Sequence, residues 1–214
     1  MPTIRIVLAT RNTHKFRELA ALLRLPGVQW RSLNAVPHAP EVRESGRTFE
    51  ANAIKKARAL ADAAGGPALA DDSGLEVDAL GGAPGVRSAR YAGRHGDDLA
   101  NNAKLLRALR GVPRSKRGAQ YRCVLALAIP GRVLGAARGV WRGRIAESPA
   151  GASGFGYDPI FFVPRFCKTA GQLSASVKNR LSHRGQAARR MHRLLARLLK
   201  AGKLPQGIQQ PPQA

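Results

Sequence analysis

Cysteine is scarce in this chain of 214 residues, which contains only Cys123 and Cys167. Neither belongs to a CxxC motif or lies at ligand spacing from a histidine, so the sequence gives no basis for a zinc site or a disulfide framework. A reducing cytoplasm is the simplest compartment for such a chain. Residues 1–10 run directly into an alternating strand pattern, and we therefore expect no export signal.

Other absences exclude whole classes of protein. No segment approaches the run of about 18 apolar residues that a membrane span needs, so we expect a soluble protein with no membrane partner. The motif GxxxxGK[ST] is missing, which argues against a Walker-type nucleotidase. The apolar fraction of 44% is ordinary for a folded protein, and the length fits one large domain or two closely joined lobes, which we treat as one domain.

Acidic residues are also few, 13 against 36 basic ones, which gives a formal net charge of +23. Such a balance suits nucleic acid, nucleotides or an acidic membrane surface equally well. Most of the excess is arginine scattered through a chain rich in Ala, Gly and Pro. We interpret it as compositional bias and expect no specific nucleic-acid partner. The alternative, a basic nucleic-acid-binding protein without catalysis, predicts strong and salt-sensitive DNA binding.

Hydrophobic periodicity predicts a chain that mixes strands and helices, a mixed α/β fold. Apolar and β-branched residues alternate over 3–9, as in a strand, and helical spacing follows over 13–25. The remaining expected elements are a helix over 48–66 capped by Thr48, a short buried strand over 67–70, a helix near 99–109, an antiparallel pair over 120–129 and 132–145, and a helix over 182–200 capped by Ser182. Residues 203–214 show no periodicity, and we expect a disordered tail there.

The turn "TRNTHK", residues 10–15, joins the first predicted strand to the first predicted helix. It places Thr10, Asn12, Thr13 and Lys15 at a helix N-terminus, where backbone and side-chain donors bind anions readily. The alternatives are that Thr13 merely caps the helix and that His14 is an ordinary surface side chain.

The few acidic residues are concentrated, since Asp71, Asp72, Glu76 and Asp78 fall within eight positions. Two adjacent carboxylates at the end of a buried strand repel each other unless a cation lies beside them. Mg²⁺ prefers one or two carboxylates and takes its other ligands from water and phosphates, so this pair, with a third carboxylate from elsewhere, indicates a phosphate-processing site. The alternatives are an arginine partner for one aspartate, or a turn at "DDSG".

Further segments supply the other parts that a nucleotide needs. Glu44 precedes the second predicted helix and Lys56 lies within it, while a glycine-rich loop contains "FGYD" at 155–158 and "SHR" opens the last helix at 182–184. Cationic donors would hold phosphates, carboxylates would hold a metal and water, and an aromatic loop would stack a base. Together these segments predict a nucleotide-processing enzyme.

The same segments resemble a known family, the inosine/xanthosine triphosphate pyrophosphatases. The resemblance runs from residue 4 to about 195 through five motifs in matching order, "VLATRNTHKFREL", "ESGRTFEANAIKKA", "LADDSGLEVDALGGAPGVRSARYAG", "GFGYDPIFF" and "SHRGQA". It implies a mixed central sheet with flanking helices, two lobes around a substrate cleft within residues 1–202, and a homodimer. It also implies Mg²⁺-dependent hydrolysis of ITP, dITP and XTP to the monophosphate and pyrophosphate, which removes these nucleotides from the pool.

The resemblance implies roles for individual residues. The phosphate-binding turn falls on Thr10, Asn12 and Lys15, with Lys56 reaching the same phosphates, and we count Arg11, Thr13 and His14 of that turn as substrate-binding. The metal carboxylates fall on Glu44 and Asp72. Asp72 is also the proton acceptor for the attacking water, and Ser73 touches the substrate. Base recognition falls on Phe155, Gly156, Tyr157, Asp158, Lys178, His183 and Arg184.

The chemistry of the base residues agrees with this assignment. Lys178 and Arg184 are obligate donors, so they match a 6-oxo purine, whereas the 6-amino group of adenine would place donor against donor. Three positions depart from the family, Arg11 where glycine is frequent, Ala51 where glutamate is common and Arg87 where an aromatic is common. A related pyrophosphatase for modified pyrimidine nucleotides is the alternative, and the pairing of "SHR" with "FGYD" argues against it.

Overall fold

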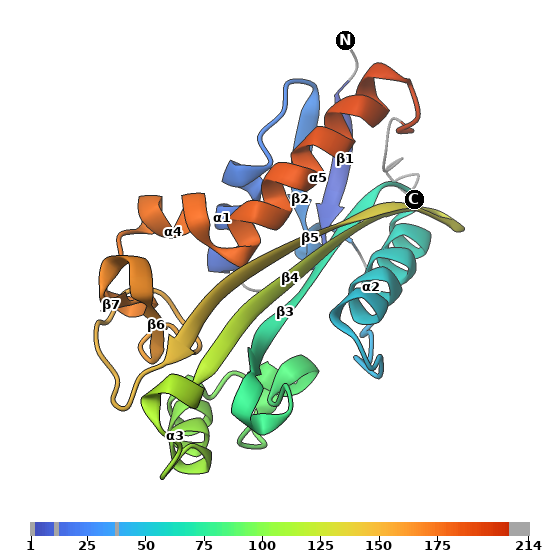
Figure 1. The fold of residues 1–214 in the computed structure, drawn as a ribbon. Helices are drawn as coiled ribbons and strands as arrows, with labels where there is room; N and C mark the ends of the chain where they lie inside the picture. The colour runs from blue at the N-terminus through green and yellow to red at the C-terminus, as the bar shows by residue number, and fades with distance from the viewer. Residues whose placement is uncertain (1–2, 11–12, 37–38, 206–214) are drawn as a thin grey trace. The chain divides into compact units, whose positions relative to one another are not determined.

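A seven-stranded sheet with the strand order β2-β1-β3-β4-β5-β6-β7 forms the framework of the protein (Figure 1). The structure is a computed structural model that describes residues 3–10, 13–36 and 39–205. The strands are β1 (Ile4–Leu8), β2 (Val28–Ser32), β3 (Ala68–Val77), β4 (Gly118–Ile129), β5 (Arg132–Ile145), β6 (Phe161–Val163) and β7 (Lys168–Thr169). β1 pairs in parallel with β2 and β3, while β6 pairs antiparallel with β5 and β7. The predicted mixed α/β sheet is therefore confirmed.

Five α-helices accompany the sheet in the described part of the chain. They are α1 (Thr13–Leu22), α2 (Phe49–Ala64), α3 (Asp98–Ala108), α4 (Ala175–Leu181) and α5 (His183–Lys200). Their ends follow local chemistry. The Thr48 hydroxyl accepts the N–H of Ala51 at 3.1 Å at the start of α2, and Gly65 ends that helix with φ of 60°. The Ser182 hydroxyl accepts the N–H of Gly185 at 3.1 Å, as the predicted cap of α5 requires.

Contacts along the chain divide it into two compact units. Unit 1 comprises residues 1–72, 124–138 and 187–214, and unit 2 comprises residues 73–123 and 139–186. The division falls within β3, β4 and β5, so each of these strands contributes to both units. The two-lobed single domain with a cleft stays a prediction. In the expected tail, Leu204 is buried, and residues 206–214 lie outside the described residues.

The core of unit 1 forms around β1, whose residues Ile6, Val7 and Leu8 are almost completely buried. Apolar side chains of α1, α2 and α5 are buried with them, namely Leu19, Leu23, Ala53, Ala57, Leu60, Ala187, Met191 and Leu195. In Figure 1, α1 and α2 lie on either side of the strands of this unit. Burying apolar area on both faces of a sheet is the main favourable term in folding such a layer.

The core of unit 2 contains a group of aromatic residues in mutual contact. Trp141 lies 5.2 Å from the ring of Phe161, and Tyr121 lies 4.6 Å from the same ring, measured between ring centroids. All three are buried together with Leu75 and Ile145. Trp141 is therefore a packing residue of this core. Tyr121 belongs to β4 and Trp141 to β5, and the loop that contains residues 155–158 follows β5 in the chain.

Strand β3 is longer than the sequence indicates. The predicted strand covered 67–70 with the acidic residues at its end, but β3 continues to Val77, so Asp71 and Asp72 lie inside a buried strand. The alternative prediction of a turn at "DDSG" is therefore wrong. Because β3 lies between β1 and β4 in the sheet, pairing on both sides extends it through residues of low strand propensity.

Candidate active site

Lys56 joins two carboxylates in unit 1. Its Nζ lies 3.0 Å from Glu44 Oε1 and 2.9 Å from Asp72 Oδ1. Helix α2 supplies the lysine, the segment before α2 supplies the glutamate, and β3 supplies the aspartate. The two predicted metal carboxylates are therefore close enough to contact one cation. Because all three groups are charged and largely buried, their mutual attraction is screened less than at an exposed surface.

Asn52 completes the environment of Asp72. It is fully buried on α2, and its Nδ2 donates to Asp72 Oδ2 at 3.2 Å. Its Oδ1 accepts the N–H of Gly46 at 2.7 Å, and a Cβ on Gly46 would lie 2.5 Å from that oxygen. The two oxygens of Asp72 thus have separate partners, Lys56 on Oδ1 and Asn52 on Oδ2.

Sequence reasoning missed Asn52. The periodicity of apolar residues over 48–66 points to apolar side chains as the buried face of α2, but Asn52 is fully buried whereas the apolar Ile54 is only half-buried. A signal was present, because Asn52 and Lys56 are four residues apart and so lie on one face of the helix. A polar residue among the buried positions of an amphipathic helix requires a polar partner, which here is Asp72.

Asp71 has a different lysine from Asp72. Its Oδ2 lies 2.5 Å from Lys15 Nζ, and its side chain is buried. Adjacent side chains of a strand point to opposite faces, which explains why Asp71 contacts a lysine of α1 and Asp72 a lysine of α2. The expectation that Asp71 and Asp72 share one metal ion with a third carboxylate is corrected: Asp72 is grouped with Glu44. Each of the two aspartates thus has a lysine partner, Lys15 for Asp71 and Lys56 for Asp72.

Burial and nearby charges shift the pKa values of Lys56 and Asp72. Burial is the largest influence on the pKa of Lys56 and lowers it, but the nearby carboxylates of Asp72, Asp71 and Glu44 together raise the pKa above its ordinary value. Burial raises the pKa of Asp72, and the attraction of Lys56 only partly opposes this effect. Lys56 therefore stays charged at neutral pH, and Asp72 is a stronger proton acceptor than an exposed aspartate.

Glu76 and Asp78 are the other two acidic residues of the cluster. Glu76 accepts hydrogen bonds from Gln120 at 2.7 Å and from Arg122 at 3.4 Å, and Asp78 is exposed.

The structure describes only part of the turn at 10–15. Thr10 is half-buried after β1, and Thr13 is the exposed first residue of α1. Arg11, Asn12 and the side chain of His14 lie outside the described residues. Ser73 follows Asp72 in β3 and is half-buried.

Asp158 organises the predicted base-recognition residues in unit 2. Its Oδ2 pairs with Lys178 Nζ and accepts the N–H of Phe155 at 3.1 Å. The Tyr121 hydroxyl contacts Oδ1 at 3.4 Å. Gly154 has φ of 93°, which favours glycine, and a Cβ there would displace the carboxylate of Asp158 and the ammonium of Lys178. The structure therefore brings Phe155, Asp158 and Lys178 together.

An aromatic ring and a guanidinium lie at the start of α5. The guanidinium of Arg184 lies 5.2 Å from the ring centroid of Phe155, and Phe155 is 47% exposed. An exposed phenyl ring supported by a cation can stack a planar base. His183 is buried and stacks on Tyr121 with ring centroids 4.6 Å apart and an interplanar angle of 9°.

Tyr157 has a packing role within the same loop. It is buried, and its hydroxyl donates to the carbonyl of Ser88 at 2.8 Å. Burial is the main cause that raises the pKa of its phenol, with smaller contributions from Tyr91 and Asp98. Its hydroxyl is thus used within unit 2, and Tyr157 supports the loop that carries Phe155 and Asp158.

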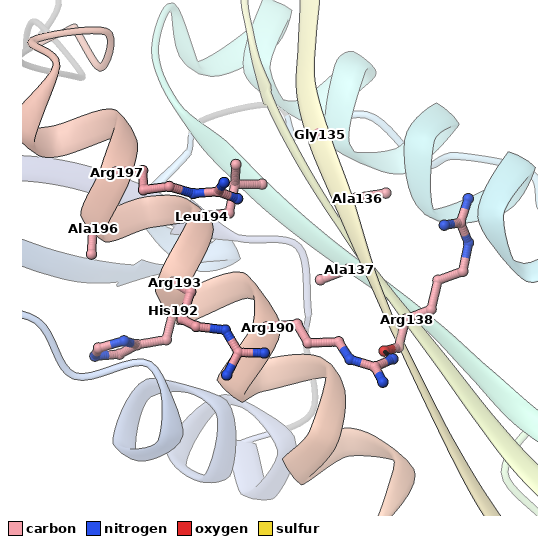
Figure 2. Close-up of a pocket in the computed structure, with 10 residues that line it drawn as sticks. All are labelled: Gly135, Ala136, Ala137, Arg138, Arg190, His192, Arg193, Leu194, Ala196 and Arg197. Carbon is pink, nitrogen blue, oxygen red and sulfur yellow. Dashed lines mark hydrogen bonds between the residues drawn. The ribbon is translucent and has the colours of Figure 1, made fainter.

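A separate hollow in unit 1 contains none of the predicted site residues. It is lined by Gly135, Ala136, Ala137, Arg138, Arg190, His192, Arg193, Leu194, Ala196 and Arg197 (Figure 2). Arg138 already pairs with Glu50, and Arg190 donates to the carbonyl of Arg138. Two of the four arginines are therefore engaged within the unit, and the hollow is not assigned to the reaction.

The part of the chain that the structure describes contains neither a cluster of metal-binding side chains nor a membrane-spanning helix. In residues 3–10, 13–36 and 39–205, no group of three or more His, Cys, Asp or Glu side chains is placed to hold a metal ion. Of the helices within those same ranges, none has the length and apolar character that crossing a membrane requires.

Sequence comparison decides the family. The sequence model of the Ham1 family matches residues 6–194. The chain belongs to the Ham1 family. A Ham1 relative named dITP/XTP pyrophosphatase from Desulforamulus reducens is 51% identical over 195 residues, which cover 91% of this chain and 97% of the relative. Another of the same name, from Geobacillus kaustophilus, is 52% identical over 182 residues, which cover 85% and 89%.

Solved structures agree with the assignment to the Ham1 family. The structure of a HAM1 protein from Coxiella burnetii matches with a TM-score of 0.85 and 43% identity, covering 91% of this chain and all of that one. The crystal structure of a nucleoside-triphosphatase, dITP/XTP pyrophosphatase, from Mycobacterium abscessus matches with a TM-score of 0.72 and 43% identity, covering 92% and 98%. These values show a common fold along nearly the whole Ham1 chain.

Proposed function

We propose that this Ham1 family member hydrolyses non-standard purine nucleoside triphosphates, ITP, dITP and XTP, to the monophosphate and pyrophosphate. The observation that carries the proposal is the contact of Glu44 and Asp72 with one cation, the ammonium of Lys56. The relatives named dITP/XTP pyrophosphatase support the same reaction and substrate class. Removal of these nucleotides from the pool is the cellular role that follows.

The donor set fits a magnesium ion, which we propose as the cofactor. Mg²⁺ is bound by one or two protein carboxylates and completes its coordination with water and substrate phosphates, so the pair formed by Glu44 and Asp72 suits it. Glu44 and Asp72 are the residues that would hold it. When bound, the ion screens the negative charge of the polyphosphate and of the leaving pyrophosphate.

The triphosphate is assigned to the residues of unit 1. Lys15 and Lys56 supply charge that attracts the phosphates, and the first turn of α1, which begins at Thr13, offers backbone N–H donors. Asp72 accepts the proton of the attacking water, because its pKa is raised and its carboxylate is held by Asn52 and Lys56. Phosphoryl transfer of this kind depends chiefly on positioning and electrostatics.

The purine is assigned to the residues of unit 2. Lys178 carries three donors, one of which is used by Asp158, so two stay available to a 6-oxo group. The exposed ring of Phe155, held beside Arg184, provides the stacking surface. Adenine presents a 6-amino donor to these donors, and the unpaired polar groups that result disfavour ATP.

Oligomeric state and compartment form a separate proposal. We infer a homodimer in the cytoplasm with no specific nucleic-acid partner, from the family resemblance and from the scarcity of cysteine in the sequence. Sedimentation equilibrium at several concentrations tests the dimer. A monomer at all concentrations contradicts it.

The experiment that tests the reaction is identification of the products from ITP by phosphorus NMR in the presence of Mg²⁺. The expected products are IMP and pyrophosphate in equal amounts. Addition of excess EDTA is expected to stop the reaction, and restored Mg²⁺ is expected to restart it. Formation of IDP and orthophosphate, or turnover in EDTA at the original rate, contradicts the proposal.

A further inference from the structure

Helix α3 binds both polar groups of one residue in the base-recognition loop. The carboxylate of Asp98 accepts the N–H of Gly156 at 2.6 Å, and the side-chain amide of Asn102 donates to the carbonyl of Gly156 at 3.0 Å. Asp98 and Asn102 are four residues apart and therefore lie on one face of the helix. All three residues belong to unit 2.

The bound residue has an unusual backbone conformation. Gly156 has φ of 65°, in the left-handed region that glycine adopts easily, and a Cβ built on it would meet no atom within 4 Å. Glycine is therefore required by the backbone angle and not by lack of space. Phe155, with its exposed ring, directly precedes Gly156, and Asp158 follows two residues later, so holding Gly156 restricts the backbone that carries both side chains.

The side-chain amide of Asn102 binds the carbonyl of Gly156 through its nitrogen and leaves its oxygen without a partner in the described part of the chain. Asn102 is buried, and among the described residues its Oδ1 has no hydrogen-bond partner. A buried polar atom without a partner is uncommon, because it loses its hydration without replacement. The nitrogen of the same amide donates to the carbonyl of Gly156, so the side chain is oriented toward that contact.

The N-cap of α3 is a different residue from these two. Asp97 is the N-cap of this helix, and its Oδ1 accepts the N–H of Ala100 at 3.0 Å. The neighbouring Asn101 accepts the N–H of Ala92 at 2.7 Å and so holds a different segment. The first turns of α3 thus separate helix capping, done by Asp97, from loop holding, done by Asp98 and Asn102.

We propose that Asp98 and Asn102 are positioning residues that set purine selectivity by holding Gly156 and, through it, Phe155 and Asp158. This inference rests on the proposed function and names two residues outside the predicted site that act on the base. Neither residue is assigned to contact the substrate. Their loss would loosen base recognition and leave the triphosphate residues of unit 1 as they are.

The test compares Asp98→Ala and Asn102→Ala with a matched control, Asp97→Ala, which removes the helix cap and leaves Gly156 bound. For each protein, kcat and KM are measured for ITP and ATP, and calorimetry measures the binding of IMP and of inorganic tripolyphosphate. Each loop-holding variant is expected to raise KM for ITP and to weaken IMP binding by about tenfold, the effect of one lost hydrogen bond. Tripolyphosphate binding is expected to stay unchanged.

Two comparisons separate positioning from simple destabilisation. Asp97→Ala is expected to lower the melting temperature and to retain the wild-type ratio of ITP to ATP turnover. Asp98→Asn keeps an oxygen acceptor for Gly156, so it is expected to recover most of the selectivity that Asp98→Ala loses. If the loop-holding variants keep wild-type selectivity, or if Asp97→Ala loses as much, the inference is wrong. ITP cleavage by the wild-type protein is measured first, so failure of the proposed function appears there and failure of this inference appears only in the variants.

Discussion

Asn52 donates a hydrogen bond to Asp72 across 3.2 Å, from a fully buried position on α2 to a buried position in β3. The other oxygen of Asp72 receives Lys56 at 2.9 Å. The carboxylate is therefore held at both oxygens. A general base held in this way has a fixed direction toward the water that it deprotonates.

Replacement of Asn52 is expected to disturb this base. Asn52→Ala leaves Asp72 Oδ2 and the N–H of Gly46 without their partner, which costs stability of about 1–3 kcal/mol and lowers kcat by about tenfold or more. Chemical denaturation and steady-state kinetics measure the two effects. Thr48→Ala is the matched control, because it removes the cap of the same helix and costs about 1 kcal/mol while leaving Asp72 bound. An equal fall of kcat in both variants contradicts the role of Asn52.

Asp72→Asn is expected to remove nearly all turnover without unfolding the protein. The amide has the same shape as the carboxylate but accepts a proton poorly, and a positioned general base contributes about 10²- to 10⁴-fold to the rate. Kinetics with ITP and circular dichroism measure activity and fold. Asp62→Asn, at an exposed carboxylate on the same helix as Lys56, serves as the control and should retain full activity. Turnover of Asp72→Asn near the wild-type rate would remove Asp72 from its role.

Lys178→Met is expected to reduce selectivity more than catalysis. The variant loses the donors assigned to the 6-oxo group and leaves Asp158 without its cation, so the ratio of kcat/KM for ITP to that for ATP should fall on the order of 100-fold. Lys104→Met provides the control, since Lys104 is exposed and donates to the carbonyl of Tyr91. The prediction fails if ITP and ATP turnover decline by the same factor.

The buried tyrosines of unit 2 predict how stability depends on pH. Burial is the main cause that raises the pKa of Tyr121 and of Tyr157 above the ordinary value. A raised pKa means that the folded state keeps these protons after the unfolded state has lost them, so the free energy of unfolding falls as the pH rises above about 10. Absorbance at alkaline pH should show both phenols ionising only as the protein unfolds. Their ionisation in the folded protein at about pH 10 contradicts this reading.

The long elements were predictable from sequence because their signals are local. The helical spacing of α2, its Thr48 cap and its terminal glycines identify that helix, and the hairpin of β4 and β5 follows from two apolar runs around Pro130 and Gly131. Short elements carry no such signal, and the strands β2, β6 and β7 and the helix α4 were not predicted. The extension of β3 through Asp71 and Asp72 depends on neighbouring strands, which a local pattern does not contain.

The site was predictable as a set of residues and not as a geometry. The resemblance named Glu44, Lys56 and Asp72, but only the fold shows that one ammonium contacts both carboxylates. It also shows that Asp71 has a separate partner in Lys15. Asn52 was missed because its hydrogen-bond partner lies 20 residues away in sequence.

The most direct test of the account is the ratio of kcat/KM for ITP to kcat/KM for ATP, measured in parallel on the wild-type protein with saturating Mg²⁺. Donors directed at a 6-oxo group predict that ITP is preferred by at least about 100-fold. Equal values for the two nucleotides would contradict the assignment of the purine to Lys178, Arg184 and the loop at 155–158.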